Sequence, residues 1–306
     1  MSRLDTIDCH YVAPELAAAY LREEGGEVAF IEVNTSLAVP RLLEALRAAG
    51  LTPEQVKFII VTHVHLDHAG GTSALLAHCP NATVLAHPRA ARHLIDPSRL
   101  VKSARQVYGD EAFDALYGTI GAIDAQRVQA LEDGETRTLG GATLRFLHTR
   151  GHANHHFVVH DESMNVVFTG DTFGLVYPLL QGQGRFAFPS TSPTDFDGRA
   201  ALESVRRIMA LKPASVALTH FGRFEDVGVI GEQLERALVF SSQLFEEGRQ
   251  SGDEQGTLEQ RFRWQLEAAL LERLGFTPDA QQKKLLHFDV ELNAQGLAFA
   301  AVKARG

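Results

Sequence analysis

The stretch Thr62-His63-Val64-His65-Leu66-Asp67-His68 is the most informative part of this chain of 306 residues. It places three imidazoles and one carboxylate within six residues, directly after the continuous apolar run 58–61. Such a run is typical of a strand covered on both faces, and side chains alternate along a strand, so His63 and His65 should project to one side. Imidazoles and carboxylates bind zinc and related divalent ions. Packed together without an ion, these groups would need other partners. The stretch therefore predicts a metal site.

Three later residues extend the predicted site, and each follows a predicted strand. His152 lies in Arg150-Gly151-His152 after a strand at 142–148, and Asp171 lies in Thr169-Gly170-Asp171-Thr172 after a strand at 165–168. His220 lies in Thr219-His220-Phe221-Gly222 after a strand at 216–218, which we expect to be the last strand of the main body. Binding residues often lie on loops that a rigid sheet positions. The ordered set therefore predicts ligands delivered to one rim by several strand ends.

Strand and helix patterns alternate through the first part of the chain. We expect further strands at 28–33, 83–86, 128–131 and 157–160, and helices at 40–49, 72–78 and 200–211. Residues 88–127 are rich in helical patterns. The strands fall into two clusters, which suits two sheets covered by helices on their outer faces.

The pattern changes after Gly222. Apolar stripes at helical spacing predict two long helices, one carrying residues 227, 230, 234 and 238 and one carrying residues 258, 262, 266, 270 and 274. Thr257-Leu258-Glu259-Gln260 fits a capping box at the start of the second helix. We predict a domain of residues 1–226 and a C-terminal helical extension of residues 227–306 that packs on it. A homodimer formed through these helical segments is the oligomer we consider.

The composition and charge of the chain limit the classes of partner that we expect it to bind. The net charge is −9 and the chain has no basic run, so we expect no nucleic acid and no anionic membrane as partner. No apolar stretch approaches the roughly 20 residues needed to span a bilayer. Residues 1–5 show no secretory signal, and two cysteines build no disulfide framework. These features predict a cytoplasmic protein that acts on a small-molecule substrate.

The ordered ligand set resembles the signature of the metallo-β-lactamase superfamily: His-x-His-x-Asp-His, then Gly-His, then Gly-Asp, then a final His. All seven positions are present, and the resemblance covers roughly residues 20–225. It implies an α/β fold, the αβ/βα four-layer sandwich, with the metals at one edge of the two sheets. It also implies that His63, His65 and His152 bind one ion, that Asp67, His68 and His220 bind a second, and that Asp171 bridges both.

The resemblance implies a metal-dependent hydrolase. Two divalent ions, zinc in the first place with iron or manganese as alternatives, would lower the pKa of a water between them and hold a bridging hydroxide. The hydroxide would attack an ester, thioester or lactone carbonyl while the ions stabilise the developing oxyanion. We assign Asp67 to orienting the hydroxide and accepting its proton. Tyr177 follows Asp171 by six residues. By likeness to similar lactonases it would donate a hydrogen bond to a substrate oxygen, the alternative being an aromatic side chain that covers the core.

Two other activities stay open. A mononuclear iron persulfide dioxygenase is similar in sequence and uses only the equivalents of His63, His152 and Asp171. A phosphodiesterase or nuclease is the second alternative, and the acidic balance of the chain argues against it. One departure from the family pattern is Glu32-Val33-Asn34, where many members carry Asp-Thr-Gly. We interpret this change as bearing on the subfamily and leaving the metal site intact.

Overall fold

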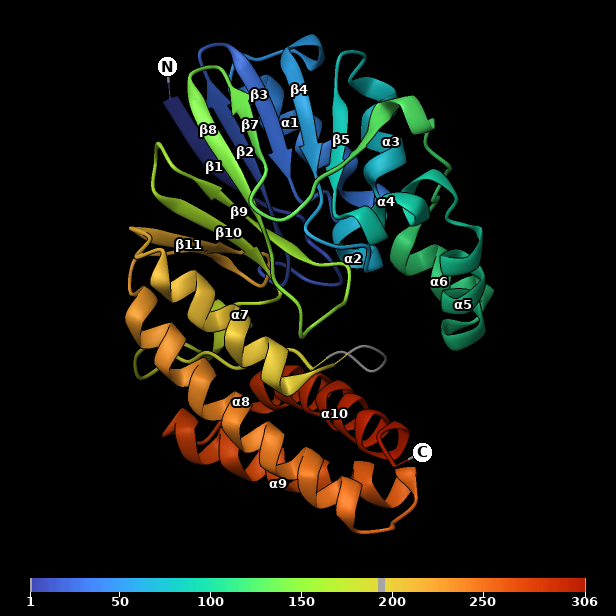
Figure 1. Cartoon of the computed structure of the whole chain (residues 1–306), viewed down its shortest axis with the longest axis vertical. Coiled ribbons are helices and arrows are strands. Elements are labelled where there is room, and N and C mark those ends of the chain that lie inside the picture. Colours follow the sequence, from blue (N-terminus) through green and yellow to red (C-terminus); the bar gives the residue numbers. More distant parts are fainter. Residues whose placement is uncertain (1, 192–195, 306) are drawn as a thin grey trace. The chain divides into compact units, whose positions relative to one another are not determined.

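Residues 2–224 contain two six-stranded sheets in the computed structural model, which describes residues 2–191 and 196–305 (Figure 1). The first sheet holds, in spatial order, β1 (Ser2–Asp8), β2 (Ala18–Glu24), β3 (Glu27–Ile31), β4 (Val56–Ile60), β5 (Thr83–Ala86) and β6 (Val128–Ala130). Its first three strands pair antiparallel, and β3 to β6 pair parallel. β3, β4 and β5 are mostly apolar and almost entirely buried, as expected of strands covered on both faces, whereas the edge strand β6 is largely exposed.

The second sheet holds, in spatial order, β12 (Gly222–Phe224), β11 (Ser215–Leu218), β10 (Val166–Gly170), β9 (Phe157–Asp161), β8 (Ala142–His148) and β7 (Thr136–Leu139). All neighbours pair antiparallel except β10 and β11, which pair parallel. The prediction that 216–218 is the last strand was wrong, because β12 follows it. With only three residues, β12 carries too short an apolar pattern to be recognised.

The two sheets pack face to face through an aromatic-rich core. Tyr20, Phe58 and Ile60 of the first sheet meet Phe146 and Phe168 of the second in this core. The Tyr20 ring lies edge-on to Phe168, with centroids 5.3 Å apart. Large buried aromatic rings contribute much of the apolar area that holds such a sandwich together.

Two polar contacts also join the sheets. The Tyr20 hydroxyl donates to the Leu218 carbonyl oxygen at 2.6 Å. The Arg22 guanidinium of β2 donates to the Asp161 carboxylate of β9 at 2.6 Å, and both side chains are fully buried. A buried charge is tolerated only where it is paired and hydrogen-bonded, so this ion pair fixes where the two sheets meet.

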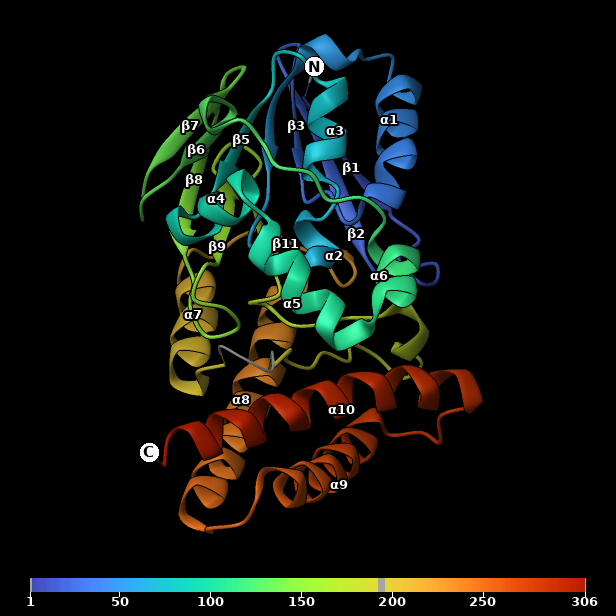
Figure 2. The same cartoon turned by 90° about the vertical axis from the view of Figure 1, so that its right-hand side faces the viewer.

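Helices cover the outer face of the first sheet. A second apolar core lies between that sheet and α1 (Val39–Ala48), α3 (Thr72–His78) and α4 (Pro88–Ile95). Figure 2 shows α1 and α3 on this face. The short α2 (Leu66–Ala69) and the pair α5 (Ser98–Tyr108) and α6 (Asp110–Tyr117) lie at one end of the sheet. Three single 3-10 turns at 36–38, 53–55 and 125–127 complete this part.

Long helices make up most of the remaining chain. They are α7 (Gly198–Ala210), α8 (Val227–Gln250), α9 (Gln255–Leu274) and α10 (Ala280–Lys303), preceded by a 3-10 turn at 178–180. α9 buries the five residues of its predicted stripe and ends at Gly275, whose φ of 73° is left-handed. The predicted capping box was wrong, because α9 begins at Gln255 with Glu254 as its cap and Thr257 lies inside the helix. Within the described ranges, no helix is both long and apolar enough to cross a membrane.

The chain divides into two compact units. The first comprises Met1–His148, His155–Gly170 and Ala214–Phe224, and the second Thr149–Asn154, Asp171–Pro213 and Glu225–Gly306. Both sheets belong to the first unit and the four long helices to the second. The architecture confirms the predicted αβ/βα sandwich with C-terminal helices. The domain boundary after residue 226 remains a prediction.

Candidate metal centre

In the first unit, the loop after β4 brings His63 and His65 together. Their ring centroids lie 4.5 Å apart. His63 is fully buried and His65 is half-buried. Thr62 Oγ1 lies 3.0 Å from His63 Nδ1. One ring nitrogen of His63 therefore has a neighbour that can orient the ring, as metal-binding histidines usually require.

Asp67, His68 and His220 form a second group in the same unit. Asp67 Oδ2 lies 3.7 Å from His68 Nε2 and 3.5 Å from His220 Nε2. One potential ligand atom from each of the three side chains lies within 4.8 Å of the others. Ligands about 2.1 Å from a tetrahedral ion lie about 3.4 Å from one another. The spacing of this group therefore fits a divalent ion.

The protonation pattern of this group also fits an ion. His220 Nδ1 donates to the Leu16 carbonyl oxygen at 2.6 Å, because a carbonyl can only accept. His68 Nδ1 lies 2.9 Å from the Glu32 carboxylate and donates to it in the same way. In the neutral imidazole the second nitrogen then carries a lone pair. Both Nε2 atoms are thus available as metal ligands beside the Asp67 carboxylate.

Sequence reasoning missed the part that Glu32 plays. Its carboxylate is buried, accepts a hydrogen bond from the Thr62 backbone at 3.0 Å and holds His68 through the other oxygen. Asn34 donates from its side chain to the Asp67 carbonyl oxygen at 2.8 Å. The interpretation that Glu32-Val33-Asn34 bears only on the subfamily is therefore incomplete. The sequence signal was that Glu32 lies at the end of a predicted buried strand. That strand is the neighbour of the strand leading into the histidine cluster, where a metal-binding histidine needs an acceptor to orient it.

The second unit brings His152 and Asp171 together. His152 Nε2 lies 3.4 Å from Asp171 Oδ2, again the spacing of two ligands of one ion, and both side chains are buried. His152 Nδ1 lies 3.3 Å from the Ser190 carbonyl oxygen. Gly151 has φ 125°, and a Cβ there would come within 2.2 Å of the Ala201 backbone nitrogen of α7. Only glycine fits this close approach, which sets the position of the following histidine.

Tyr177 lies in the same unit as Asp171 and is buried. Its ring centroid is 6.1 Å from that of Phe188, and its carbonyl oxygen accepts from the Gln181 side chain at 2.9 Å. These contacts fit an aromatic side chain that packs in the loop region. A hydrogen bond from Tyr177 to a substrate remains a prediction.

A family model described as the metallo-beta-lactamase superfamily matches residues 14–220, which contain all seven predicted ligands. This chain belongs to the metallo-β-lactamase superfamily. Members of the superfamily are typically hydrolases, and the histidine and aspartate groups described above could hold a metal ion.

Relatives within the superfamily include the metallo-beta-lactamase fold-containing protein ST1585 of Sulfurisphaera tokodaii. It is 32% identical to this chain over 173 residues, which are 55% of this chain and 62% of ST1585. The match thus spans less than two thirds of that relative. The crystal structure of ST1585 aligns with a TM-score of 0.68 at 24% identity and covers 96% of this chain and 97% of that one. This structural likeness shows the fold.

Two enzymes resemble shorter parts of the chain. The hydroxyacylglutathione hydrolase of Aeromonas hydrophila is 29% identical over 131 residues, which are 43% of this chain and 37% of that enzyme. The thioesterase pkgB of Emericella nidulans is 31% identical over 116 residues, which are 38% of this chain and 24% of that enzyme.

Proposed function

We propose that this member of the superfamily is a binuclear metal-dependent hydrolase that cleaves a thioester, or a related ester or lactone. The group of Asp67, His68 and His220 carries this proposal. Its ligand atoms have the spacing of a metal site, and the other ring nitrogen of each histidine is occupied by an acceptor. Nothing in folding alone requires two buried imidazoles to direct lone pairs at one carboxylate.

The seven residues form one centre in this proposal. By the family signature, His63, His65 and His152 would hold one ion, Asp67, His68 and His220 would hold the other, and Asp171 would be a ligand of both. Zinc is the ion we expect, since imidazole and carboxylate suit it and it stays bound in neutral conditions. Two divalent ions, when bound, supply a water with a lowered pKa and an electrophile for the carbonyl oxygen.

The side chains of this chain orient the reaction. Asp67 offers a half-buried carboxylate that accepts the proton of the attacking water. Glu32 and the Leu16 carbonyl accept from Nδ1 of His68 and His220, which selects the tautomer whose Nε2 would bind an ion. A ring fixed in one tautomer needs no rearrangement during turnover, which is the advantage of a preorganised site.

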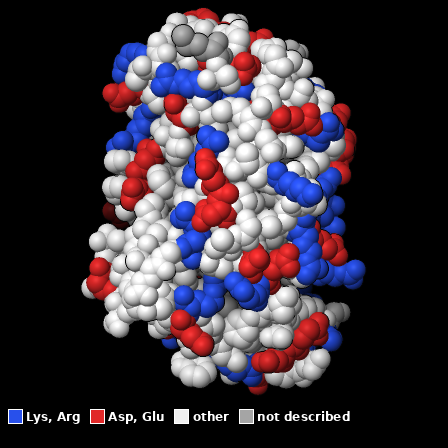
Figure 3. Space-filling model, turned by 90° about the vertical axis from the view of Figure 1, so that its left-hand side faces the viewer, with Lys and Arg blue, Asp and Glu red and all other residues white. Residues whose placement is uncertain are grey.

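The two named enzymes among the relatives support thioesters as the substrate class. Hydroxyacylglutathione hydrolase and thioesterase are both names for enzymes that cleave the carbon–sulfur bond of a thioester. Because each match covers less than half of this chain, the acid and the thiol of the substrate are proposed only as a class. Acidic and basic side chains are intermixed on the molecular face in Figure 3.

The test is a panel of thioesters, esters and lactones assayed with zinc-loaded protein and with His220→Ala. We expect thioester hydrolysis, and a loss in kcat/KM of more than about 100-fold in the variant, since even outer partners of ligands cost 10–100-fold. The control is His78→Ala, an exposed histidine of α3 whose loss should leave the rate unchanged. Equal rates for wild type and His220→Ala would contradict the proposal. So would oxygen uptake on glutathione persulfide by protein with one iron, which would identify the dioxygenase instead.

A further inference from the structure

Three tyrosines gather beside the metal ligands of the first unit. Tyr11 lies in the loop 9–17 between β1 and β2, Tyr108 ends α5, and Tyr117 ends α6. The Tyr117 ring centroid is 6.4 Å from that of Tyr11, in a stacked arrangement, and 5.7 Å from that of Tyr108, edge-on. We call these three residues the tyrosine ledge.

The tyrosine ledge connects directly to the ligand-bearing helix α2. Leu66, which separates His65 from Asp67, packs in one apolar cluster with Tyr117 and Tyr11. Figure 2 shows α5 and α6 beside α2. Burial, with a further contribution from the negative charge of Asp67, raises the pKa of Tyr11.

The loop that carries Tyr11 is also fixed to the metal group. Its Leu16 carbonyl oxygen is the acceptor of the His220 ring, and Ala18 at its end donates to the Thr219 carbonyl oxygen at 2.8 Å. His10 and Val12, on either side of Tyr11, have φ of 52° and 62°. A β-branched residue in the left-handed region is uncommon and persists only where surrounding contacts impose it. The loop therefore holds Tyr11 in one place relative to Asp67 and His220.

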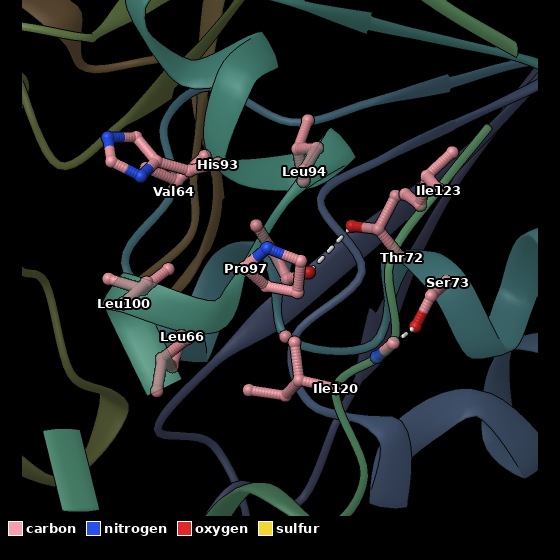
Figure 4. Close-up of a pocket in the computed structure, with 13 residues that line it drawn as sticks. Val64, Leu66, Thr72, Ser73, His93, Leu94, Pro97, Leu100, Ile120 and Ile123 are labelled. Atoms are coloured by element: carbon pink, nitrogen blue, oxygen red, sulfur yellow. Dashed lines mark hydrogen bonds between the residues drawn. The ribbon is translucent and has the colours of Figure 1, made fainter. Parts of the chain in front are cut away.

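The ledge is partly open to solvent. Tyr108 is 45% exposed and the neighbouring Val107 is 77% exposed. α5 buries none of its side chains completely. Leu66, Leu100 and Ile120 line a small apolar cavity that is too small to hold a substrate group (Figure 4). A partly exposed aromatic surface beside Leu66, which lies between two predicted ligands, is suited to contact with an apolar group.

The cation Arg105, near the ledge, is already paired. Arg105 of α5 lies over the Phe113 ring and forms ion pairs with Asp110 at 2.9 Å and Asp114 at 2.6 Å. Because its guanidinium already has two carboxylate partners within the protein, it does not need a substrate carboxylate as a counter-charge. The ledge itself consists of neutral phenols, so its chemistry favours an uncharged aromatic or aliphatic group over an anionic one.

We propose that the tyrosine ledge binds the acyl group of the substrate and selects acids that carry an aromatic or bulky apolar group. This inference rests on the proposed hydrolase function. It adds the chemical class of the acyl group, which the metal ligands alone do not specify. The scissile carbonyl lies at the Asp67 group, and the acyl group extends from it over Leu66 onto the rings of Tyr11, Tyr117 and Tyr108. These residues position the substrate and take no part in bond cleavage.

The test compares acetyl and phenylacetyl thioesters of one thiol. In Tyr108→Ala the ratio of kcat/KM for phenylacetyl over acetyl should fall by about 3- to 10-fold, the size of one aromatic pair, and the change should lie in KM. Tyr11→Phe should keep the ratio and Tyr11→Ala should lower it, because the ring makes the contact. The matched control is Phe288→Ala, an exposed aromatic of α10, which should keep the ratio.

A binding measurement separates this inference from the proposed function. Titration of zinc-loaded protein with sodium phenylacetate and sodium acetate should give tighter binding of phenylacetate, weakened in Tyr108→Ala. If wild type hydrolyses no thioester but binds phenylacetate through Tyr108, the ledge stands and the proposed function fails. Equal loss on both thioesters in Tyr108→Ala, or equal binding of both acids by wild type, would overturn the ledge.

Discussion

The Glu32 carboxylate lies 2.9 Å from Nδ1 of His68, and both side chains are buried. The contact links the end of β3 to α2, since Glu32 follows the strand and His68 lies on the helix. Its second oxygen accepts from the Thr62 backbone. Glu32 therefore fixes both the tautomer of His68 and the chain that leads into the ligands.

Glu32→Gln tests this relationship. The amide can still accept from Thr62, but its other end can present an N–H to His68 Nδ1, which removes the acceptor that selects the tautomer. We expect zinc affinity to fall by about 10- to 100-fold with the fold retained. Competition with a chromogenic chelator measures the affinity. The control is Glu27→Gln, whose carboxylate pairs with Lys57 at the surface and should not change zinc binding. Unchanged affinity in Glu32→Gln would refute the positioning role.

Removing one partner of the buried ion pair of Arg22 and Asp161 should be strongly destabilising. Asp161→Asn leaves a fully buried guanidinium without its main counter-charge, which we expect to cost about 3 kcal/mol in the free energy of unfolding. Urea unfolding followed by circular dichroism gives this value. Glu203→Gln breaks the exposed pair with Arg199 and should change stability by less than about 0.5 kcal/mol. Similar losses in the free energy of unfolding for the two substitutions would show that the buried pair contributes no more to stability than the exposed pair.

His87 should make stability depend on pH. Burial, with a further contribution from His148, lowers the pKa of His87 to about 3 from the ordinary 6.5. Between these pH values the unfolded chain binds a proton that the folded chain does not. Stability is therefore fully present above about pH 6.5 and is lost as the pH falls toward 3, by at most about 1.4 kcal/mol per pH unit.

His87→Asn removes this titration while keeping an acceptor for the Arg89 backbone N–H, which His87 Nδ1 provides in the native chain. Urea unfolding between pH 7.5 and pH 5 should show a shallower loss of stability in the variant. If the two proteins lose stability in parallel, other groups account for the pH dependence.

Much of the fold follows from local sequence patterns. The apolar run at 83–86 and the helical spacing at 72–78 coincide with β5 and α3. β2 was missed, because its buried Arg22 breaks the apolar pattern, and only the distant Asp161 explains why a charge is tolerated there. Long-range pairing of this kind leaves no local signal.

In the candidate site too, some residues carry a local sequence signal and others do not. Residue type and spacing were enough to propose the seven ligands, and the structure brings Asp67, His68 and His220 together and places His152 beside Asp171. The groups that orient them come from chemically ordinary positions. The Leu16 carbonyl that holds His220 is a backbone atom 204 residues away, and no side-chain pattern marks it. The position of Tyr11 likewise depends on how the loop 9–17 folds over the ligands.

The most direct measurement of the central claim is the metal content of zinc-loaded protein by mass spectrometry, with thioester turnover recorded on the same sample. The account predicts about two zinc ions per chain with turnover, and about one ion with turnover largely lost in His220→Ala. One iron per chain, no hydrolysis and oxygen consumption on a persulfide would contradict it.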